Sequence, residues 1–134
     1  MERRVTFALD AEAPSQARAV VGRELEPLSR EVREDATLLV SELITNAVRH
    51  AVGAGLPEVE LTIRNEPGRV RVVVSDPGGG FEPASRPPTA SQASGWGLYL
   101  VDRIADRWGV LSKDRNEVWF ELEVDEAQGE PGPG

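Results

Sequence analysis

The sequence predicts an α+β protein built as a two-layer sandwich, with a mixed or antiparallel sheet and three helices on one face. Three observations predict this class. Residues 59–64 and 70–74 alternate between apolar and polar side chains across a short turn, and residues 108–112 and 118–124 form a second such pair. Short turns join neighbouring antiparallel strands. Helical periodicity occupies segments before and between these pairs, which favours helices gathered on one face of the sheet.

The N-terminal segment predicts one strand followed by one helix. Residues 5–9 alternate between large apolar and smaller side chains, as in a strand with one buried face. Pro14 suits the first turn of the helix that follows, because the missing N–H has no partner there, and Pro27 helps to end it. The apolar positions follow helical spacing at Ala17, Val20, Val21, Leu25 and Leu28.

The second helix is the clearest in the chain. Ser29 is of the residue type that caps a helix N-terminus, and Gly53 and Gly55 are typical of a helix end. Between them, helical spacing predicts one apolar face. That face consists of Ala36, Leu39, Val40, Leu43, Ile44, Ala47, Val48 and Ala51.

The C-terminal half predicts the remaining elements and the domain boundary. A turn over residues 65–68 joins the first strand pair, and a turn over 113–116 joins the second. Residues 81–95 are rich in proline, serine and alanine, and so long a loop is either functional or disordered. A third helix begins at Gly95-Trp96-Gly97. One domain therefore covers residues 1–124, and the acidic, Gly/Pro-rich residues 125–134 form a disordered tail.

Composition excludes several classes of protein. The net charge is −8, which disfavours direct nucleic-acid binding because phosphate backbones are repelled. There is no cysteine, so disulfides and cysteine-ligated metals are excluded, and a reducing compartment is compatible. We see no charged-then-apolar leader and no long apolar run. We therefore expect a soluble cytoplasmic protein without a membrane segment.

A polar row marks the second helix. Glu42, Asn46 and His50 are spaced by four residues, so they lie in a row opposite the apolar stripe, and Arg49 lies beside Asn46. A solvated polar face explains such a row without any function, and a positive charge near a helix C-terminus explains His50. Asparagine is nevertheless a poor helix-interior residue, and a carboxylate one turn from a carboxamide is a plausible oxygen-ligand set for Mg²⁺.

Two glycine motifs accompany this row. Asp76 follows a predicted strand and is followed by Gly78 and Gly80, which allow backbone to approach a ligand closely. An ordinary glycine-rich turn is the alternative. Gly95 and Gly97 open the third helix, where bare backbone N–H groups suit phosphate oxygens. No Gly-Lys-Ser/Thr follows, which excludes a Walker loop, and the absence of a surrounding βαβ unit argues against a dinucleotide-binding fingerprint.

In order and spacing, these motifs resemble the GHKL ATPases, a superfamily with the Bergerat nucleotide-binding fold. The family's asparagine box, E-x-x-x-N, is similar to Glu42–Asn46. Its first glycine box, D-x-G-x-G, is similar to Asp76–Gly80, and its second, G-x-G-L/F, to Gly95–Leu98. A short chain with ELITNAVRHA and DPGGGF most resembles the bacterial anti-sigma-factor serine/threonine kinases.

The resemblance implies an activity, cofactors and partners. Members of that family bind ATP and Mg²⁺, hold a sigma factor inactive and phosphorylate an anti-anti-sigma protein on serine or threonine. They commonly form homodimers, so a homodimer is expected. By the same likeness, Asn46 ligates Mg²⁺, Glu42 orients or deprotonates the attacking hydroxyl, and Asp76 reads the adenine amine, with Gly78 and Gly80 framing the base.

The second glycine box carries the remaining implied contacts. Gly95, Gly97 and Leu98, flanked by Ser94 and Trp96, would place amides at the phosphates. Residues 82–94 would form a lid over ATP, and Arg49 and Arg86 would reach phosphates. Two alternatives stay open. One is a nucleotide-dependent binding module without useful kinase activity, and the other is a detached sensor-kinase ATPase domain that phosphorylates histidine.

Overall fold

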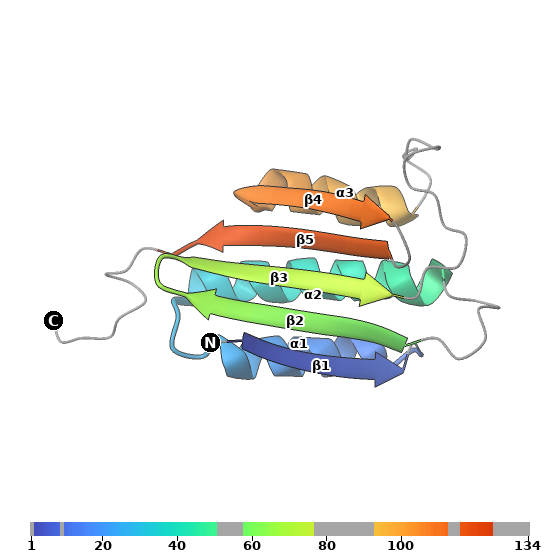
Figure 1. Ribbon diagram of the computed structural model, residues 1–134, viewed down its shortest axis with the longest axis horizontal. Helices are drawn as coiled ribbons and strands as arrows, with labels where there is room; N and C mark the ends of the chain where they lie inside the picture. The colour runs from blue at the N-terminus through green and yellow to red at the C-terminus, as the bar shows by residue number, and fades with distance from the viewer. Residues whose placement is uncertain (1, 9, 51–57, 77–92, 113–115, 125–134) are drawn as a thin grey trace, which may run out of the picture.

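The computed structural model describes residues 2–8, 10–50, 58–76, 93–112 and 116–124. Over these residues the chain forms five strands and three helices, and Figure 1 shows their arrangement. The elements are β1 Glu2–Ala8, α1 Ala13–Glu24, α2 Arg30–His50, β2 Glu58–Glu66, β3 Arg69–Asp76, α3 Ala93–Ile104, β4 Arg107–Ser112 and β5 Asn116–Glu123.

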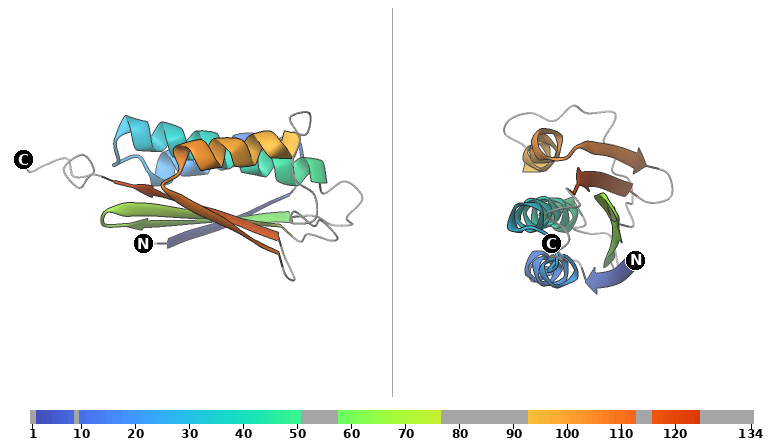
Figure 2. Two further views of the ribbon diagram at one scale, coloured as in Figure 1. Left: turned by 90° about the horizontal axis from the view of Figure 1, so that it is seen from above. Right: turned by 90° about the vertical axis from the view of Figure 1, so that its left-hand side faces the viewer.

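The strands form one sheet in the order β1-β2-β3-β5-β4. Each recorded pairing of neighbouring strands is antiparallel, so of the two predicted arrangements the antiparallel one is confirmed. The helices lie side by side on one face of this sheet (Figure 2). The predicted α+β two-layer sandwich is therefore confirmed.

The core lies between the two layers. Register pairs Leu61 with Val74 and Val72 with Phe120, so the apolar positions of adjacent strands fall on the same, helix-covered face. The predicted apolar face of α2 is buried at Ala36, Leu39, Val40, Leu43, Ile44 and Ala47. Ala51, which completes that prediction, lies outside the described residues.

Local signals set several element ends. The Ser29 hydroxyl accepts a hydrogen bond from the Val32 N–H at 3.3 Å, which confirms the predicted N-cap of α2. Pro14 lies in the first turn of α1, as predicted. The turn between β2 and β3 consists of Pro67 and Gly68, and Gly68 has a φ of 84°, a conformation that glycine adopts without strain.

Other predicted boundaries are corrected or stay predictions. Helix α3 begins at Ala93, two residues before the predicted start, so Gly95 and Gly97 lie inside its first turns. Gly95 falls in the first turn, where backbone N–H groups have no partner inside the helix, whereas the N–H of Gly97 lies one turn after the carbonyl of Ala93 and is not bare, contrary to the prediction. Leu9, Gly53, Gly55, the turn at 113–115 and the tail at 125–134 lie outside the described residues.

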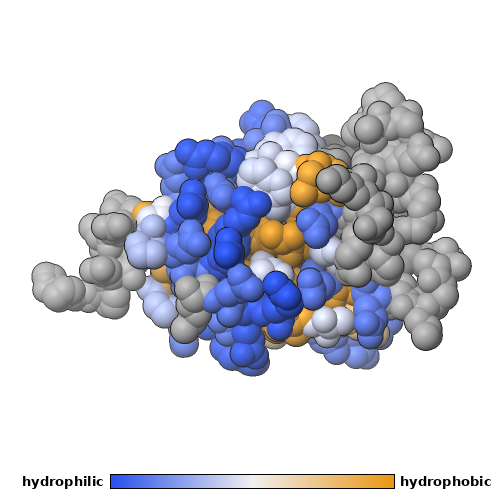
Figure 3. All heavy atoms as spheres, in the orientation of Figure 1, coloured by the Kyte–Doolittle hydropathy of each residue, from blue (hydrophilic) through white to orange (hydrophobic). Residues whose placement is uncertain are grey.

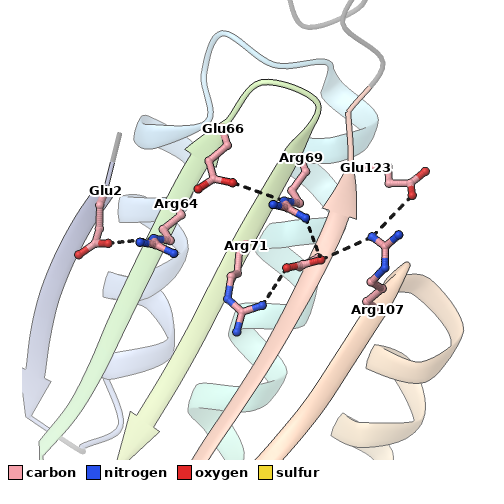
Figure 4. Close-up of polar contacts among 8 residues, drawn as sticks. Glu2, Arg64, Glu66, Arg69, Arg71, Arg107 and Glu123 are labelled. Carbon is pink, nitrogen blue, oxygen red and sulfur yellow. Dashed lines mark hydrogen bonds and ion pairs between the residues drawn. The ribbon is translucent and has the colours of Figure 1, made fainter.

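The face of the sheet opposite the helices carries a charged network (Figures 3 and 4). The Glu121 carboxylate on β5 is nearly buried, with 8% of its side chain exposed. Arg71 pairs with it at 2.8 Å, Arg107 at 3.5 Å and Arg69 at 3.8 Å. Because β5 lies between β3 and β4, arginines from both neighbouring strands reach the same carboxylate.

An aromatic ring lies beside this network. The Arg71 guanidinium stacks over the Trp119 ring, 4.2 Å from its centroid. Leu111 on β4 is half exposed on this face, and hydrophobic atoms show between the charged side chains in Figure 3. Among the helices of the described residues, none combines the length and the apolar character needed to span a membrane.

Candidate functional site

Three element ends meet at one end of the molecule. The C-terminal end of α2, the C-terminal end of β3 and the N-terminal end of α3 lie at the same end in Figures 1 and 2. The asparagine box lies on the first of these elements, Asp76 on the second and the second glycine box on the third. Segments far apart in sequence are thus brought to one end by the fold.

Glu42 and Asn46 occupy successive turns of α2. Both side chains are partly exposed, whereas Leu43, Ile44 and Ala47 beside them are buried. The predicted row therefore borders the buried stripe and does not lie opposite it. The physical reason is that α2 is the central helix of the layer, in contact with both α1 and α3, so both of its flanks are partly covered.

Position 76 is fixed by the register of β3. Asp76 is the last residue of the strand and pairs with Asn116 of β5, whereas the sequence placed it just past the strand end. Val70, Val72 and Val74 are buried on the helix-covered face. The neighbouring Ser75 is buried at 3% exposure.

The other predicted site residues are placed only by their elements. Arg49 lies in the last turn of α2. Ser94, Gly95, Trp96, Gly97 and Leu98 lie in the first half of α3, and for these residues, Arg49 and Asp76 the roles of the side chains stay predictions. Gly78, Gly80, Arg86 and most of the predicted lid lie outside the described residues. His50 is the last residue of α2. This agrees with the interpretation of His50 as a residue near a helix C-terminus.

Ser75 is the residue near this site that the sequence analysis did not single out. It precedes Asp76 in the sequence and is one of two polar or charged residues recorded as buried in the described part of the chain. The signal that could have found it is its position between a valine run and an aspartate. A serine there interrupts an otherwise apolar strand end.

The residues present set limits on a metal site. Within the described ranges, no cluster of three or more His, Asp or Glu side chains could hold a metal ion. A metal held by three or more such side chains therefore has no site within those ranges. Mg²⁺ bound to a nucleotide does fit, because it keeps several waters and phosphate oxygens and needs one or two protein oxygens. Asn46 and Glu42 offer an amide oxygen and a carboxylate of that kind.

Comparison with known proteins identifies the family. The family model described as the histidine kinase-like ATPase domain matches residues 7–122, which is most of the chain. The chain therefore belongs to the histidine kinase-like ATPase domain family, and this membership implies ATP binding. The resemblance to the GHKL ATPases is confirmed by the same match.

A solved structure shares the fold. The crystal structure of the RsbU and RsbW domains of Rv1364c from Mycobacterium tuberculosis matches 92% of this chain with a TM-score of 0.73 and 16% sequence identity. The match covers 32% of the chain in that structure, about a third of its length. At this identity the match establishes a common fold. No curated protein sequence matches the chain.

Proposed function

We propose that this protein is an ATP-dependent serine/threonine kinase and anti-sigma factor, which phosphorylates an anti-anti-sigma protein and regulates transcription by partner switching. One observation carries the proposal: in a histidine kinase-like ATPase domain, the elements that carry the asparagine box, Asp76 and the second glycine box have their ends at one end of the molecule. The chain also shares its fold with a structure that contains an RsbW domain, which supports the proposal of an anti-sigma kinase.

Each site residue has a proposed role. Asn46 would hold Mg²⁺ beside the phosphates, where the ion neutralises charge. Glu42, one turn earlier on α2, would orient the substrate hydroxyl and accept its proton, and Asp76 would accept a hydrogen bond from the adenine amine. Little covalent chemistry is required of these groups, because phosphoryl transfer depends mainly on positioning and charge neutralisation.

The glycine-box residues complete the proposed site. Gly78 and Gly80 would frame the base, and Gly95, Gly97 and Leu98, with Ser94 and Trp96, would present backbone N–H groups to the phosphates. The start of α3 at Ala93 supports this for Ser94 and Gly95, whose N–H groups fall among the first four of the helix and have no partner inside it. Gly97 and Leu98 come later, so their N–H groups would reach a phosphate only if α3 began later when nucleotide is bound. Arg49 at the end of α2 and Arg86 are proposed phosphate contacts.

The proposed partners are a sigma factor, an anti-anti-sigma protein and a second copy of the chain. We propose that the protein works in the cytoplasm and does not bind nucleic acid directly, in keeping with its net charge of −8. Residues 1–124 are proposed to form the kinase domain, with a disordered tail at residues 125–134.

Calorimetry with ATP and saturating Mg²⁺ tests the nucleotide site. We expect the wild type to bind ATP and Asn46→Ala to lose measurable binding. Gln16→Ala, which removes an exposed amide from α1, is the matched control and should bind as the wild type does. No binding of ATP or ADP by the wild type would refute the proposal.

Label transfer from ATP separates the kinase from its alternatives. With the anti-anti-sigma candidate encoded nearest in the genome, we expect acid-stable label on serine or threonine. Glu42→Gln should lose this transfer while still binding ATP. ATP binding without transfer would favour a nucleotide-dependent binding module, and acid-labile label on a histidine would indicate a detached sensor-kinase domain.

A further inference from the structure

A groove runs along the outer surface of the helical layer, between α1 and α2. Its volume is about 440 Å³, and its lining comes from the end of α1 and the first half of α2. The lining residues are Gly22, Arg30, Arg33, Glu34, Thr37 and Leu38. The asparagine box lies further along α2, towards the opposite end of that helix, so this groove is separate from the nucleotide site (Figure 2).

Arg33 is an incompletely satisfied cation in this groove. Its Nε atom is buried and has no hydrogen-bond partner. Within the described part of the chain, no carboxylate is recorded in an ion pair with its guanidinium, although this chain carries 23 acidic residues. A buried donor without an acceptor is unfavourable, and more so on a charged group. Arg33 as a whole is only partly buried and lines the groove, so a carboxylate that entered would meet the terminal nitrogens of this guanidinium and neutralise its charge.

Gly22 forms an open part of the groove wall. A β-carbon added at this position would meet nothing within 4 Å. Glycine is a poor residue inside a helix, and neither packing nor a positive φ requires it here. The glycine therefore gives space in the groove that a larger side chain would fill.

The rim adds an apolar contact and a second cation. Leu38 is 41% exposed, one of the large hydrophobic residues on the surface of the described chain. Arg30 is paired only loosely, with Glu34 one turn away at 3.9 Å, and both side chains are largely exposed. Such a pair is weak and readily rearranged. The groove thus combines a deep guanidinium, a second one at the rim and an exposed leucine.

We propose that this groove docks an acidic segment of a protein partner, with a carboxylate on Arg33 and an adjacent apolar side chain on Leu38. Charge complementarity selects this occupant. The chain as a whole has a net charge of −8, whereas the groove is lined by two arginines against one glutamate, Glu34, and so attracts an acidic segment locally. A simple inorganic anion would use Arg33 but not Leu38. The inference does not depend on nucleotide binding or on kinase activity.

Nuclear magnetic resonance of the full chain tests the proposal. The probe is a short peptide of alternating glutamate and leucine with blocked ends, and the reference peptide has glutamine in place of glutamate. We expect the acidic peptide to shift the Arg33 Nε–Hε signal saturably, together with the amides around Gly22 and Leu38. The glutamine peptide should bind more weakly by at least about tenfold.

Three variants make the result specific. Arg33→Gln should weaken binding of the acidic peptide by at least about tenfold, which is about 1.4 kcal/mol. Gly22→Leu should block the groove while every arginine remains. Arg103→Gln removes an equal charge from α3, outside the groove, and should bind as the wild type does. Each variant is first checked for a wild-type melting curve.

Several outcomes would overturn the proposal. Equal binding of the two peptides, or wild-type binding by both Arg33→Gln and Gly22→Leu, would rule out the groove as an acidic docking site. An equal shift with inorganic phosphate at the same concentration would indicate a simple anion site. If the Arg33 signal of the free protein moves when Asp125, Glu126 and Glu130 are changed to their amides, the occupant is the chain's own tail and not a partner.

Discussion

The ring of Trp119 lies directly over Gly109 on the neighbouring strand. The two residues are register partners in β5 and β4, and a β-carbon added at Gly109 would lie 2.7 Å from Nε1 of Trp119. The same ring is stacked by the Arg71 guanidinium, 4.2 Å from its centroid. The absence of a side chain at position 109 is therefore what lets the ring lie flat on the open face of the sheet.

Gly109→Ala should destabilise the fold. The added methyl group would displace the Trp119 ring and disturb its stacking with Arg71, at a cost of about 1–3 kcal/mol, as for other overpacked sites. Denaturant unfolding followed by tryptophan fluorescence measures the change. Gly22→Ala is the matched control, because its β-carbon meets nothing, and it should stabilise by about 0.5–1 kcal/mol. Equal effects of the two changes would contradict this account.

Glu121→Gln should lower the stability of the sheet. It removes the one carboxylate shared by Arg69, Arg71 and Arg107 and leaves a nearly buried amide among guanidinium groups, at a cost of about 1–3 kcal/mol. Urea unfolding at low and high salt measures this loss. Glu123→Gln, at a side chain that is 63% exposed, should change stability by less than about 0.5 kcal/mol. A larger effect at Glu123 than at Glu121 would refute the assignment.

The stability of Asp35→Asn relative to the wild type should increase as pH rises. Burial, and then the nearby Glu31, Glu34 and Asp106, raise the pKa of Asp35 above its ordinary value of 3.8. Because ionisation of Asp35 is harder in the folded chain, the contribution of Asp35 to wild-type stability falls as pH increases from 3.8 through its raised pKa. Asparagine does not ionise, so the variant escapes this loss.

Urea midpoints measured from about pH 3 to about pH 7 check this prediction. The difference between Asp35→Asn and the wild type should grow in favour of the variant over that range. Glu26→Gln, which removes an exposed negative charge on the loop after α1, controls for the general effect of lower net charge. A difference that stays constant with pH, or one that Glu26→Gln reproduces, would show that Asp35 is not the group responsible.

Ser29→Ala should destabilise α2 at its start. The variant loses the hydroxyl that accepts from the Val32 N–H, and such caps contribute about 0.5–2 kcal/mol. Thermal unfolding followed by circular dichroism measures the loss. Ser29→Asp keeps an acceptor at the same place and should restore most of the stability. A melting temperature for Ser29→Ala equal to that of the wild type would argue against the cap.

Periodic segments were predictable because their pattern repeats over many residues. The apolar face of α2 and the strands around Val72 and Phe120 follow their expected periods, and each is buried as predicted. Boundaries and flanks were less predictable. The start of α3 at Ala93 and the partial cover of Asn46 depend on neighbouring elements, which contribute no signal to the local sequence.

The candidate site was also predictable in part. The order of Glu42, Asn46, Asp76, Gly95 and Gly97 along the chain already indicated a nucleotide fold, because those residue types are costly or unusual without a ligand. The sheet topology, which the motifs do not indicate, brings the elements that carry these residues to one end of the molecule. The groove with Arg33 had no signal in the sequence, since an arginine at that spacing looks like any solvated helix residue.

The sequence by itself determined the elements, their class and the family, because hydrophobic period, caps and motif spacing are local properties of the chain. Only the tertiary structure decided which side chains share a surface: three arginines on Glu121, the Trp119 ring on Gly109, and the groove beside Gly22. The physical reason is that these contacts join strands or helices whose register and packing are set by burial of the common core, across many residues at once.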